Sequence, residues 1–498
     1  MAQMTSKRIL VAMSGGVDSS VAAHLLVEKI KNFTPTYKHN MHIMGLFMRN
    51  WSPLDEEGNT RYCEASERDW KDAERVCQQL GIPLHRHDFV REYWTGVFEP
   101  FVHEIASNIT PNPDIMCNSA VKFGAMKDYA CRSDTLAADL IATGHYARLA
   151  RGSSELDEML AVAADEGSKS SSDDEAWLAF TSLERNTHSF KSSNDPDYYN
   201  NLAHTPMLLS AVDRSKDQSY FLCGTKDTAL RNVLFPLGDL YKTTRPNSTP
   251  ISLKKRKQSN RARELSGDDD YDDDVTVRDI AHAANLTTAS KRESMGICFV
   301  GKRKFPQFIS EYLPDPMPGR FICVDTGEVV GKHSGSALIT IGQGAKIGGA
   351  SQKWFVTHKH PNTGDVFVCG GTHHPALYVD EFFTAASSFN WIGGRFASAL
   401  SNGKSLRALC RVRHLQPLIE CEISLEDGDR LVLRTFRPLR AVTPGQTVSV
   451  YIANGDICLG GAPIIGKGST YYERGLVLPN DIHPSGSNDS SYFRRIIS

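Results

Sequence analysis

The sequence predicts an α/β fold with an open parallel sheet, followed by smaller β-rich domains. Strand-like and helix-like segments alternate over roughly the first 145 residues, which is typical of a parallel sheet. Two adjacent glycines, Gly15 and Gly16, lie between an apolar run and a helical run, as at a strand-to-helix turn. After residue 305, short alternating segments and turn pairs such as Asp427-Gly428 and Asn454-Gly455 favour small β domains or a barrel.

The elements of the first domain follow from hydrophobic spacing. The segment Ser66 to Leu80 has helical spacing, and Gly81 and Pro83 end it. A second helix is expected near Glu92 to Ser107. Apolar runs predict four strands, at Ile9–Met13, His42–Met48, Leu84–Phe89 and Asp139–Thr143.

The stretch Ser14 to Ser20 is a candidate phosphate site. Its two glycines let the backbone approach a ligand, and Asp18 is suited to the first turn of a helix whose N–H groups attract an anion. No lysine follows the glycines, so this is not a Walker loop. Met48 and Gly144 also fall at carboxyl ends of predicted strands, where ligands bind in such sheets. The alternative is a glycine turn without a ligand.

Composition limits the other possibilities. The net charge is −2, so any RNA site must be a local patch. Eleven cysteines occur without a C-x-x-C pair or a secretory signal, which indicates reduced thiols and disfavours zinc and iron–sulfur sites. No apolar run of ~18 residues predicts a membrane span. Met1 to Lys7 is too short for a usual Arg-rich presequence.

Two cysteines stand in distinctive surroundings. Two prolines are expected to fix an irregular loop over Thr110 to Asn118 that presents Asp114 and Cys117. The alternative is a proline-rich connector with a buried cysteine. Cys298 lies in the strand-like patch Glu293 to Gly301, and taken alone it would be a core residue. His145, after the last predicted strand, would by itself more often be structural than catalytic.

Taken together and in order, several motifs resemble the tRNA-specific 2-thiouridylases, and the resemblance covers nearly all of residues 7 to 466 outside two inserts. The motifs are SGGVDSSV, GLFMRNW, NPDIMCN, ATGHYAR, KDQSYFL, ESMGICFVG and AVTPGQ. The resemblance implies an ATP-pyrophosphatase domain (PP-loop, adenine nucleotide α-hydrolase-like) and a C-terminal β-barrel. The implied divisions are a catalytic domain at 1–305, a central β-rich tRNA-binding domain at 306–384, the β-barrel at 385–466 and a polar tail at 467–498.

The resemblance also implies roles for individual residues. The catalytic residues would be Cys117, Cys298 and Asp114. The ATP site would be Ala12, Met13, Ser14, Gly15, Gly16, Val17, Asp18, Ser19, Met48 and Gly144. Contacts to tRNA or its target base would be Asn112, Pro113, Asp114, His145, Lys216, Asp217, Gln218, Arg413, His414 and Gln446.

The implied reaction uses ATP and Mg²⁺, without a protein-held metal site. The 2-oxygen of a wobble uridine, turned out of its loop, would attack the α-phosphate of ATP. A persulfide on Cys298 would then deliver sulfur, and Cys117 would end as the disulfide partner of Cys298. Asp114 would be a general base or a reader of the base, and the sequence leaves both roles open. Lys122 or Lys291 would be the positive neighbour of a reactive thiol.

The implied partners are tRNA and a sulfur donor, either a cysteine desulfurase or a carrier protein. The resemblance also implies a monomer when free, no membrane contact and, for eukaryotic members, a mitochondrial location. Two rival functions remain: another adenylating enzyme of the same nucleotide fold, or an inactive tRNA-binding homologue. The adenylating enzyme would need an ammonia source and would not need Cys117 or Cys298. The inactive homologue would be expected to have lost loop glycines, Asp18 or one of these cysteines.

Several segments depart from the family plan or lie outside it. Residues 153–201 are polar and aperiodic, and residues 243–274 join a basic run to an acidic one; both read as surface inserts. The stretch Ile341 to Gly349 departs from the usual Gln-Arg-Lys-Gly pattern and lacks its arginine. Alternation predicts Arg411 and Arg413 on the same face of one strand, suited to phosphate contacts or simply solvated.

Overall fold

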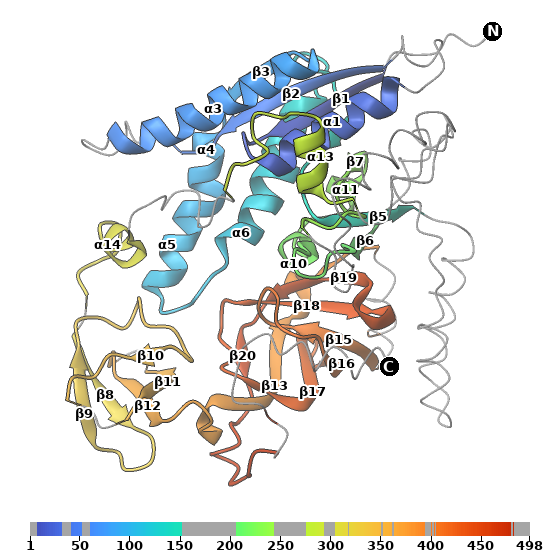
Figure 1. The fold of residues 1–498 in the computed structure, drawn as a ribbon. Coiled ribbons are helices and arrows are strands. Elements are labelled where there is room, and N and C mark those ends of the chain that lie inside the picture. The colour runs from blue at the N-terminus through green and yellow to red at the C-terminus, as the bar shows by residue number, and fades with distance from the viewer. Residues whose placement is uncertain are drawn as a thin grey trace, which may run out of the picture.

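The computed structural model describes residues 7–31, 41–51, 60–151, 206–243, 275–292, 304–316, 318–349, 352–360, 363–393 and 405–479, with the single residues 400, 403 and 482. Insert 153–201, nearly all of insert 243–274 and the segment with Cys298 lie outside these residues. The described chain forms an α/β domain and two β domains (Figure 1).

The α/β domain is built on a five-stranded parallel sheet with the order β3-β2-β1-β4-β7. The four strands that the sequence predicted are confirmed, and the fifth was missed because two residues are too short to show periodicity. At the centre, Ile9 to Val11 are fully buried. The strands are β1 (Lys7–Met13), β2 (Met41–Arg49), β3 (Leu84–Asp88), β4 (Leu140–Ala142) and β7 (Val233–Leu234).

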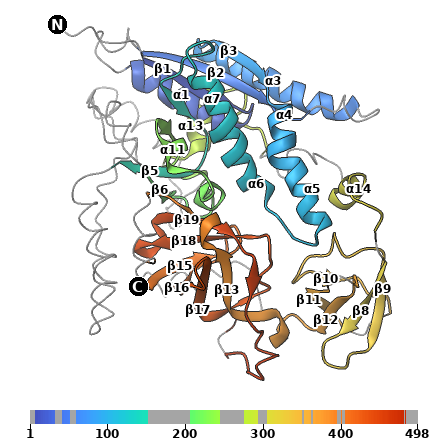
Figure 2. The ribbon, with the colours of Figure 1, turned by 180° about the vertical axis from the view of Figure 1, so that it is seen from behind.

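Helices cover both faces of this sheet (Figures 1 and 2). One face, with Ile9 and Val11, packs against α1 (Val17–Lys31), α3 (Thr60–Leu80) and α13 (Val277–Ala283). The opposite face, with Leu10 and Ile141, packs against two helical segments that each contain a π-helical stretch. These segments are α4 (Val90–Tyr93), η2 (Trp94–Phe98) and α5 (Glu99–Ala106), then α6 (Pro113–Met116), η3 (Cys117–Ala125) and α7 (Met126–Cys131).

The second segment differs from the expected irregular loop over Thr110 to Asn118. The loop ends at Asn112, whose side chain accepts a hydrogen bond from the Asp114 N–H at 3.2 Å as a helix N-cap. Pro113 takes the first helical position, where its missing N–H costs no helical hydrogen bond. Asp114 and Cys117 are therefore presented by a helix and not by a loop.

The central domain is a five-stranded sheet with the order β10-β11-β12-β8-β9. The short helix α14 (Phe305–Ser310) leads into it. The strands are β8 (Gly319–Cys323), β9 (Val329–His333), β10 (Gly344–Ala345), β11 (Trp354–Lys359) and β12 (Val366–Gly370).

The C-terminal domain is a curled antiparallel sheet around its own apolar core. The turn predictions at Asp427-Gly428 and Asn454-Gly455 are confirmed, since all four residues have positive φ between consecutive strands. The strands are β13 (Tyr378–Ala385), β14 (Asn390–Trp391), β15 (Leu406–Arg411), β16 (Ile419–Glu426), β17 (Arg430–Arg440), β18 (Thr447–Ile452), β19 (Ile457–Pro463) and β20 (Gly466–Lys467), and the single turns are η6 (Pro375–Leu377), η7 (Ala386–Ser388) and η8 (Ala453–Gly455).

A hairpin from the first half of the chain extends this C-terminal sheet. The strands β5 (Ala147–Arg151) and β6 (Pro206–Ser210) pair with each other, and Leu208 and Leu209 of β6 pair with β19. The α/β domain and the barrel are therefore joined by backbone hydrogen bonds. Two short helices, α10 (Ser219–Leu222) and α11 (Asp227–Leu230), follow the hairpin at this junction.

Part of the polar tail is packed against the β domains. Tyr471 and Leu478 lie on a small apolar cluster with Cys369 and Tyr378, and Arg474 pairs with Asp380 at 2.7 Å. None of the described helices combines the length and apolar character needed to cross a membrane.

Candidate functional site

The glycine loop lies between the end of β1 and the start of α1, at the carboxyl edge of the parallel sheet. Gly15 has φ +71°, and a Cβ built there would lie 2.1 Å from the Asp69 carbonyl oxygen. Only glycine fits this cradle. The Ser20 hydroxyl donates to the Gly16 carbonyl at 2.8 Å and so stabilises the turn. The N–H groups in the first turn of a helix such as α1 can receive an anion such as phosphate.

The neighbouring strands bring the other nucleotide-site candidates to this loop. Met13 pairs with Phe47, so Met48 lies beside Ser14 at the next position of the ladder. Gly144 follows β4, and a Cβ on it would lie 2.8 Å from the Ser19 nitrogen. The residues predicted for ATP, from Ala12 to Ser19 with Met48 and Gly144, thus lie together at one edge of the sheet. The glycines at 15 and 144 allow neighbouring segments to pack closely against this loop.

Asp18 in the first turn of α1 is held by two donors from distant segments. The Tyr146 hydroxyl donates to Oδ1 at 2.8 Å, and the Lys242 ammonium contacts the same oxygen. Lys242 is only 1 % exposed. Oδ2 has no hydrogen bond within the described part of the chain and is available to a cation. Neither Tyr146 nor Lys242 is among the predicted site residues. Tyr146 lies within the motif ATGHYAR, and Lys242 carries no local signal.

Lys291 supports the loop from the other side. Its ammonium donates to the Gly15 carbonyl at 2.8 Å and binds Asp69 at 2.7 Å and Asp72 at 2.5 Å. Burial alone would lower the pKa of Lys291, but the two carboxylates outweigh it, and the pKa is raised. Within the described residues this ammonium therefore serves the glycine loop; its expected relation to the Cys298 thiol lies outside them.

The helix after Asn112 presents the second group of candidates. Cys117 is 5 % exposed and belongs to the buried apolar cluster that includes Leu10 and Ile141 of the sheet. Asp114 reaches the surface, but the protein atoms crowded around it raise its pKa, against a smaller lowering by Lys122 and His414. Asp114 is thus a carboxyl group that holds its proton more tightly than usual, at the start of a helix and near Lys122 and His414.

His145 links the strand edge to this helix. Its Nδ1 lies 2.7 Å from the Thr143 hydroxyl, and its Nε2 lies 3.2 Å from Asn118 Oδ1 and 3.5 Å from the Lys122 ammonium. Burial, with Lys122 adding to it, lowers the pKa of His145 well below its usual value. The ring is therefore neutral and almost buried, and its contacts are internal ones between β4 and η3.

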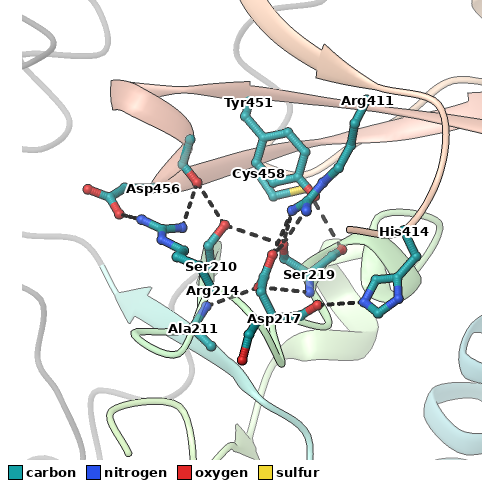
Figure 3. A network of polar contacts seen from close by, with 12 residues as sticks. Ser210, Ala211, Arg214, Asp217, Ser219, Arg411, His414, Tyr451, Asp456 and Cys458 are labelled. Atoms are coloured by element: carbon teal, nitrogen blue, oxygen red, sulfur yellow. Dashed lines mark hydrogen bonds and ion pairs between the residues drawn. The ribbon is translucent and has the colours of Figure 1, made fainter. Parts of the chain in front are cut away.

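The Lys216-Asp217-Gln218 turn is largely internal. Asp217 is 1 % exposed and binds Arg411 at 2.6 Å (Figure 3). Gln218 forms two hydrogen bonds with the backbone of Tyr146, at 2.8 and 2.9 Å. Lys216 is partly exposed.

The expectation that Arg411 and Arg413 lie on the same face of one strand is wrong. β15 ends at Arg411, whose guanidinium is buried against Asp217 and Tyr451. Arg413 lies beyond the strand, half-buried, and donates to the Ala441 carbonyl. Alternation along a strand indicates which side chains share a face, but not which other segment covers that face.

Two barrel residues predicted as tRNA contacts touch the catalytic half of the chain. The His414 Nε2 donates to the Asp217 carbonyl at 2.9 Å, and its ring lies 4.3 Å from that of Phe221. The Gln446 amide donates to the Thr110 carbonyl at 2.9 Å. Both therefore lie beside the approach to Asn112-Pro113-Asp114. Within the described ranges, no three His, Cys, Asp or Glu side chains are grouped to hold a metal ion.

Three family models match the chain. They are described as the tRNA methyl transferase HUP domain (residues 7–175 and 190–262), the tRNA methyl transferase PRC-barrel domain (306–370) and the Aminomethyltransferase beta-barrel domain (383–464). They correspond to the parallel sheet, the central sheet and the curled C-terminal sheet.

Full-length relatives are also similar. The chain is 36 % identical over 466 residues to mitochondrial tRNA-specific 2-thiouridylase 1 of Homo sapiens, covering 94 % of this chain and 92 % of that protein. It is 34 % identical over 460 residues to the Drosophila melanogaster protein of the same name, covering 92 % and 94 %. It is 35 % identical over 459 residues to tRNA-specific 2-thiouridylase MnmA of Listeria monocytogenes, covering 92 % and 94 %.

Proposed function

The chain belongs to the tRNA-specific 2-thiouridylase family, and we propose that it catalyses ATP-dependent 2-thiolation of the wobble uridine of tRNA. One observation carries the proposal: residues 143–146 touch both halves of the site. Gly144 abuts the N-terminus of α1, Tyr146 donates to Asp18, and His145 contacts Asn118 and Lys122 on the helix of Cys117. A nucleotide on the glycine loop and a base beside Asp114 would therefore be neighbours.

The first step is adenylation of the base. The uridine 2-oxygen attacks the α-phosphate of ATP, pyrophosphate leaves, and the poor leaving oxygen becomes part of AMP. The N–H groups at the start of α1 stabilise charge on the departing pyrophosphate. When bound, Mg²⁺ would supply further positive charge there, and Asp18 is the residue that fits it, because Oδ2 has no partner among the described residues.

The second step delivers sulfur. The terminal sulfur of a Cys298 persulfide attacks the activated ring carbon, and AMP leaves. The Cys117 thiolate then attacks the Cys298 sulfur, which breaks the S–S bond, leaves sulfur on the base and forms a Cys117–Cys298 disulfide. An external thiol reduces that disulfide before the next cycle. Asp114 either takes the uridine N3 proton or accepts a hydrogen bond from the base edge.

The partners follow from this chemistry. The substrate is a tRNA whose wobble base is turned out of its loop, and the sulfur comes from a cysteine desulfurase or a carrier protein. We place the protein in mitochondria by analogy with its named eukaryotic relatives. We further propose that it is a monomer when free. The remaining candidate tRNA contacts are Asn112, Pro113, Lys216, Arg413, His414 and Gln446.

The test is thiolation of unmodified tRNA by purified protein with ATP, Mg²⁺ and a persulfide donor, namely a cysteine desulfurase supplied with cysteine. Nucleoside mass spectrometry measures 2-thiouridine while AMP release is followed in parallel. Matched amounts of both products support the proposal. If AMP forms without thiouridine, the protein is another adenylating enzyme of the same nucleotide fold. If neither product forms, the remaining hypothesis is the inactive tRNA-binding homologue.

The persulfide step has its own test. Cys298→Ser should abolish thiolation but leave ATP binding unchanged, since the glycine loop is untouched. Normal thiolation by this variant would overturn the persulfide scheme. Cys131→Ser is a matched control, because Cys131 is exposed at the end of α7, away from the predicted site.

A further inference from the structure

The loop before Asp114 is held by the C-terminal barrel. The Thr110 carbonyl accepts from Gln446 at 2.9 Å, and the Thr110 N–H donates to the Pro444 carbonyl at 3.2 Å. Gly445 packs so closely that a Cβ there would lie 2.2 Å from the side chain of Ile109. The segment that leads into the catalytic helix therefore takes its position from a domain more than 300 residues further along the chain.

One buried ion pair fixes the barrel against the catalytic half. The Arg411 Nη2 donates to Asp217 Oδ2 at 2.6 Å and to the Tyr451 hydroxyl at 2.8 Å, while Nε donates to that hydroxyl at 3.1 Å (Figure 3). The exposed fractions of the two charged side chains are 7 % and 1 %. Asp217 Oδ1 in turn accepts from the N–H groups of Ala211 and Ser219.

Contacts run from this pair to both ends of residues 110–118, which we call the catalytic loop although they become helical from Pro113 on. The Asp217 carbonyl accepts from His414, and Ser219 begins the short helix that carries Tyr220 and Phe221. The Phe221 carbonyl accepts from Asn118 at 3.0 Å, next to Cys117.

Tyr220 reaches the other end of the loop. Its hydroxyl donates to the Thr447 carbonyl of the barrel at 3.0 Å and also binds the side chain of Asn112. The turn at Asp217 is thus connected to the residues on either side of Asp114.

We propose that Arg411 is a positioning residue for the catalytic loop, acting through Asp217, and not a contact to RNA. A buried ion pair adds little net stability, but it fixes one geometry, because any other arrangement leaves a buried charge unpaired. The rigid fork of arginine binds Asp217 and Tyr451 together, which lysine cannot reproduce. The proposed function supplies the reaction that this positioning would serve.

The experiment compares Arg411→Met with Arg407→Met. Arg407 is on the same strand but exposed, and it pairs with Glu420 at the surface. Hydrogen–deuterium exchange of peptides covering residues 108–118 measures how firmly this segment is held, independently of any enzymatic activity. Single-turnover AMP formation at saturating tRNA reports its catalytic consequence, and the salt dependence of tRNA binding reports phosphate contacts.

For Arg411→Met we expect exchange over 108–118 to rise about tenfold, with unchanged exchange over residues 8–20. AMP formation should fall roughly 100-fold, as for a small misplacement of reacting groups. The slope of log Kd against log salt should match that of the parent protein. Arg407→Met should behave as the parent in exchange and in rate. Arg411→Lys should recover only part of the loss.

Parent-like exchange over residues 108–118 in Arg411→Met would overturn the proposal. So would a parent-like rate of AMP formation together with a slope of log Kd against log salt that is smaller by the amount expected for about one lost phosphate contact. If Arg411→Met does not fold, Tyr451→Phe tests the proposal in its place, because this variant removes only the hydroxyl that orients the Arg411 guanidinium. Parent-like exchange and rate in that variant would also overturn it. If the parent makes no AMP, the proposed function fails, while the exchange data still decide the positioning role.

Discussion

Lys242 and Asp18 are separated by 224 positions in the chain, yet the buried Lys242 ammonium binds the Asp18 carboxylate at the start of α1. The pair gives the glycine loop a neighbouring cation that its own sequence lacks. It also means that a substitution of Asp18 changes both the ligand site and the environment of a buried charge.

Asp18→Ala should abolish adenylation and also destabilise the fold. Without the carboxylate, the Lys242 ammonium stays buried beside Tyr146 with one acceptor fewer, which costs about 1–3 kcal/mol. Chemical denaturation measures the free energy of unfolding, and Asp18→Ala/Lys242→Met should regain part of the loss. Glu28→Ala, which breaks the exposed pair with Lys31, is the control and should cost under about 0.5 kcal/mol. Equal losses in Asp18→Ala and Glu28→Ala would contradict this account.

Gly15→Ala should weaken ATP binding by about tenfold or more, or ~1.4 kcal/mol. Its new methyl would meet the Asp69 carbonyl and push the loop away from α3. Gly81→Ala is matched, since Gly81 has the same φ of +71° but nothing within 4 Å of its built Cβ. Both variants bear the ~1–2 kcal/mol cost of left-handed backbone. Calorimetric titration with ATP measures the affinity of each variant. A similar loss of affinity in Gly15→Ala and Gly81→Ala would refute the steric explanation.

The raised pKa of Asp114 predicts an acid limb in the pH–rate profile. If Asp114 is the general base, its ionised form is active, so the rate should rise with pH through a midpoint above the usual 3.8. Asp114→Asn would then lose the limb along with most of the rate. If Asp114 instead reads the base, Asn should keep the same pH dependence and mainly raise KM for tRNA. A limb centred at or below 3.8 would contradict the effect of burial.

The lowered pKa of His145 predicts a pH-dependent contribution to stability. The unfolded chain protonates this histidine near pH 6.5, whereas the folded chain resists protonation. The contribution is therefore complete above pH 6.5 and is lost as the pH falls below it, by up to ~1.4 kcal/mol per pH unit. Denaturation of His145→Gln and the parent between pH 7.5 and 5.0 measures the difference. Parallel curves for the two proteins would show that His145 does not contribute.

Replacing residues 152–205 by Asn-Gly should leave the fold intact. Arg151 and Pro206 are partners at the end of the β5–β6 ladder, so a two-residue turn can close the hairpin. We expect thiolation within about twofold of the parent and an unfolding temperature within a few degrees. The same replacement with Gly-Gly tests whether turn chemistry matters. A large loss of activity in both would mean that the insert contributes to the reaction.

Local sequence patterns were enough to predict the strands and the glycine turn at the proposed nucleotide site. The four predicted strands and the glycine turn depend on apolar runs and on backbone freedom, which are properties of neighbouring residues. The start of the helix at Pro113 was missed although its signal was local: an asparagine cap followed by proline and aspartate. The two prolines of this motif predict a loop, because prolines more often mark a turn than a helix start.

Three contacts between distant segments could be seen only in the tertiary structure. The β5–β6 hairpin joins β19, Lys242 pairs with Asp18, and Arg411 pairs with Asp217 instead of facing solvent. Each joins segments separated by about 200 residues or more. The sequence by itself determined the parallel sheet, the glycine turn after its first strand and the family, because these follow from short-range patterning and ordered motifs. Which charges meet was decided only when distant segments folded together, because a buried charge is stable only beside its partner.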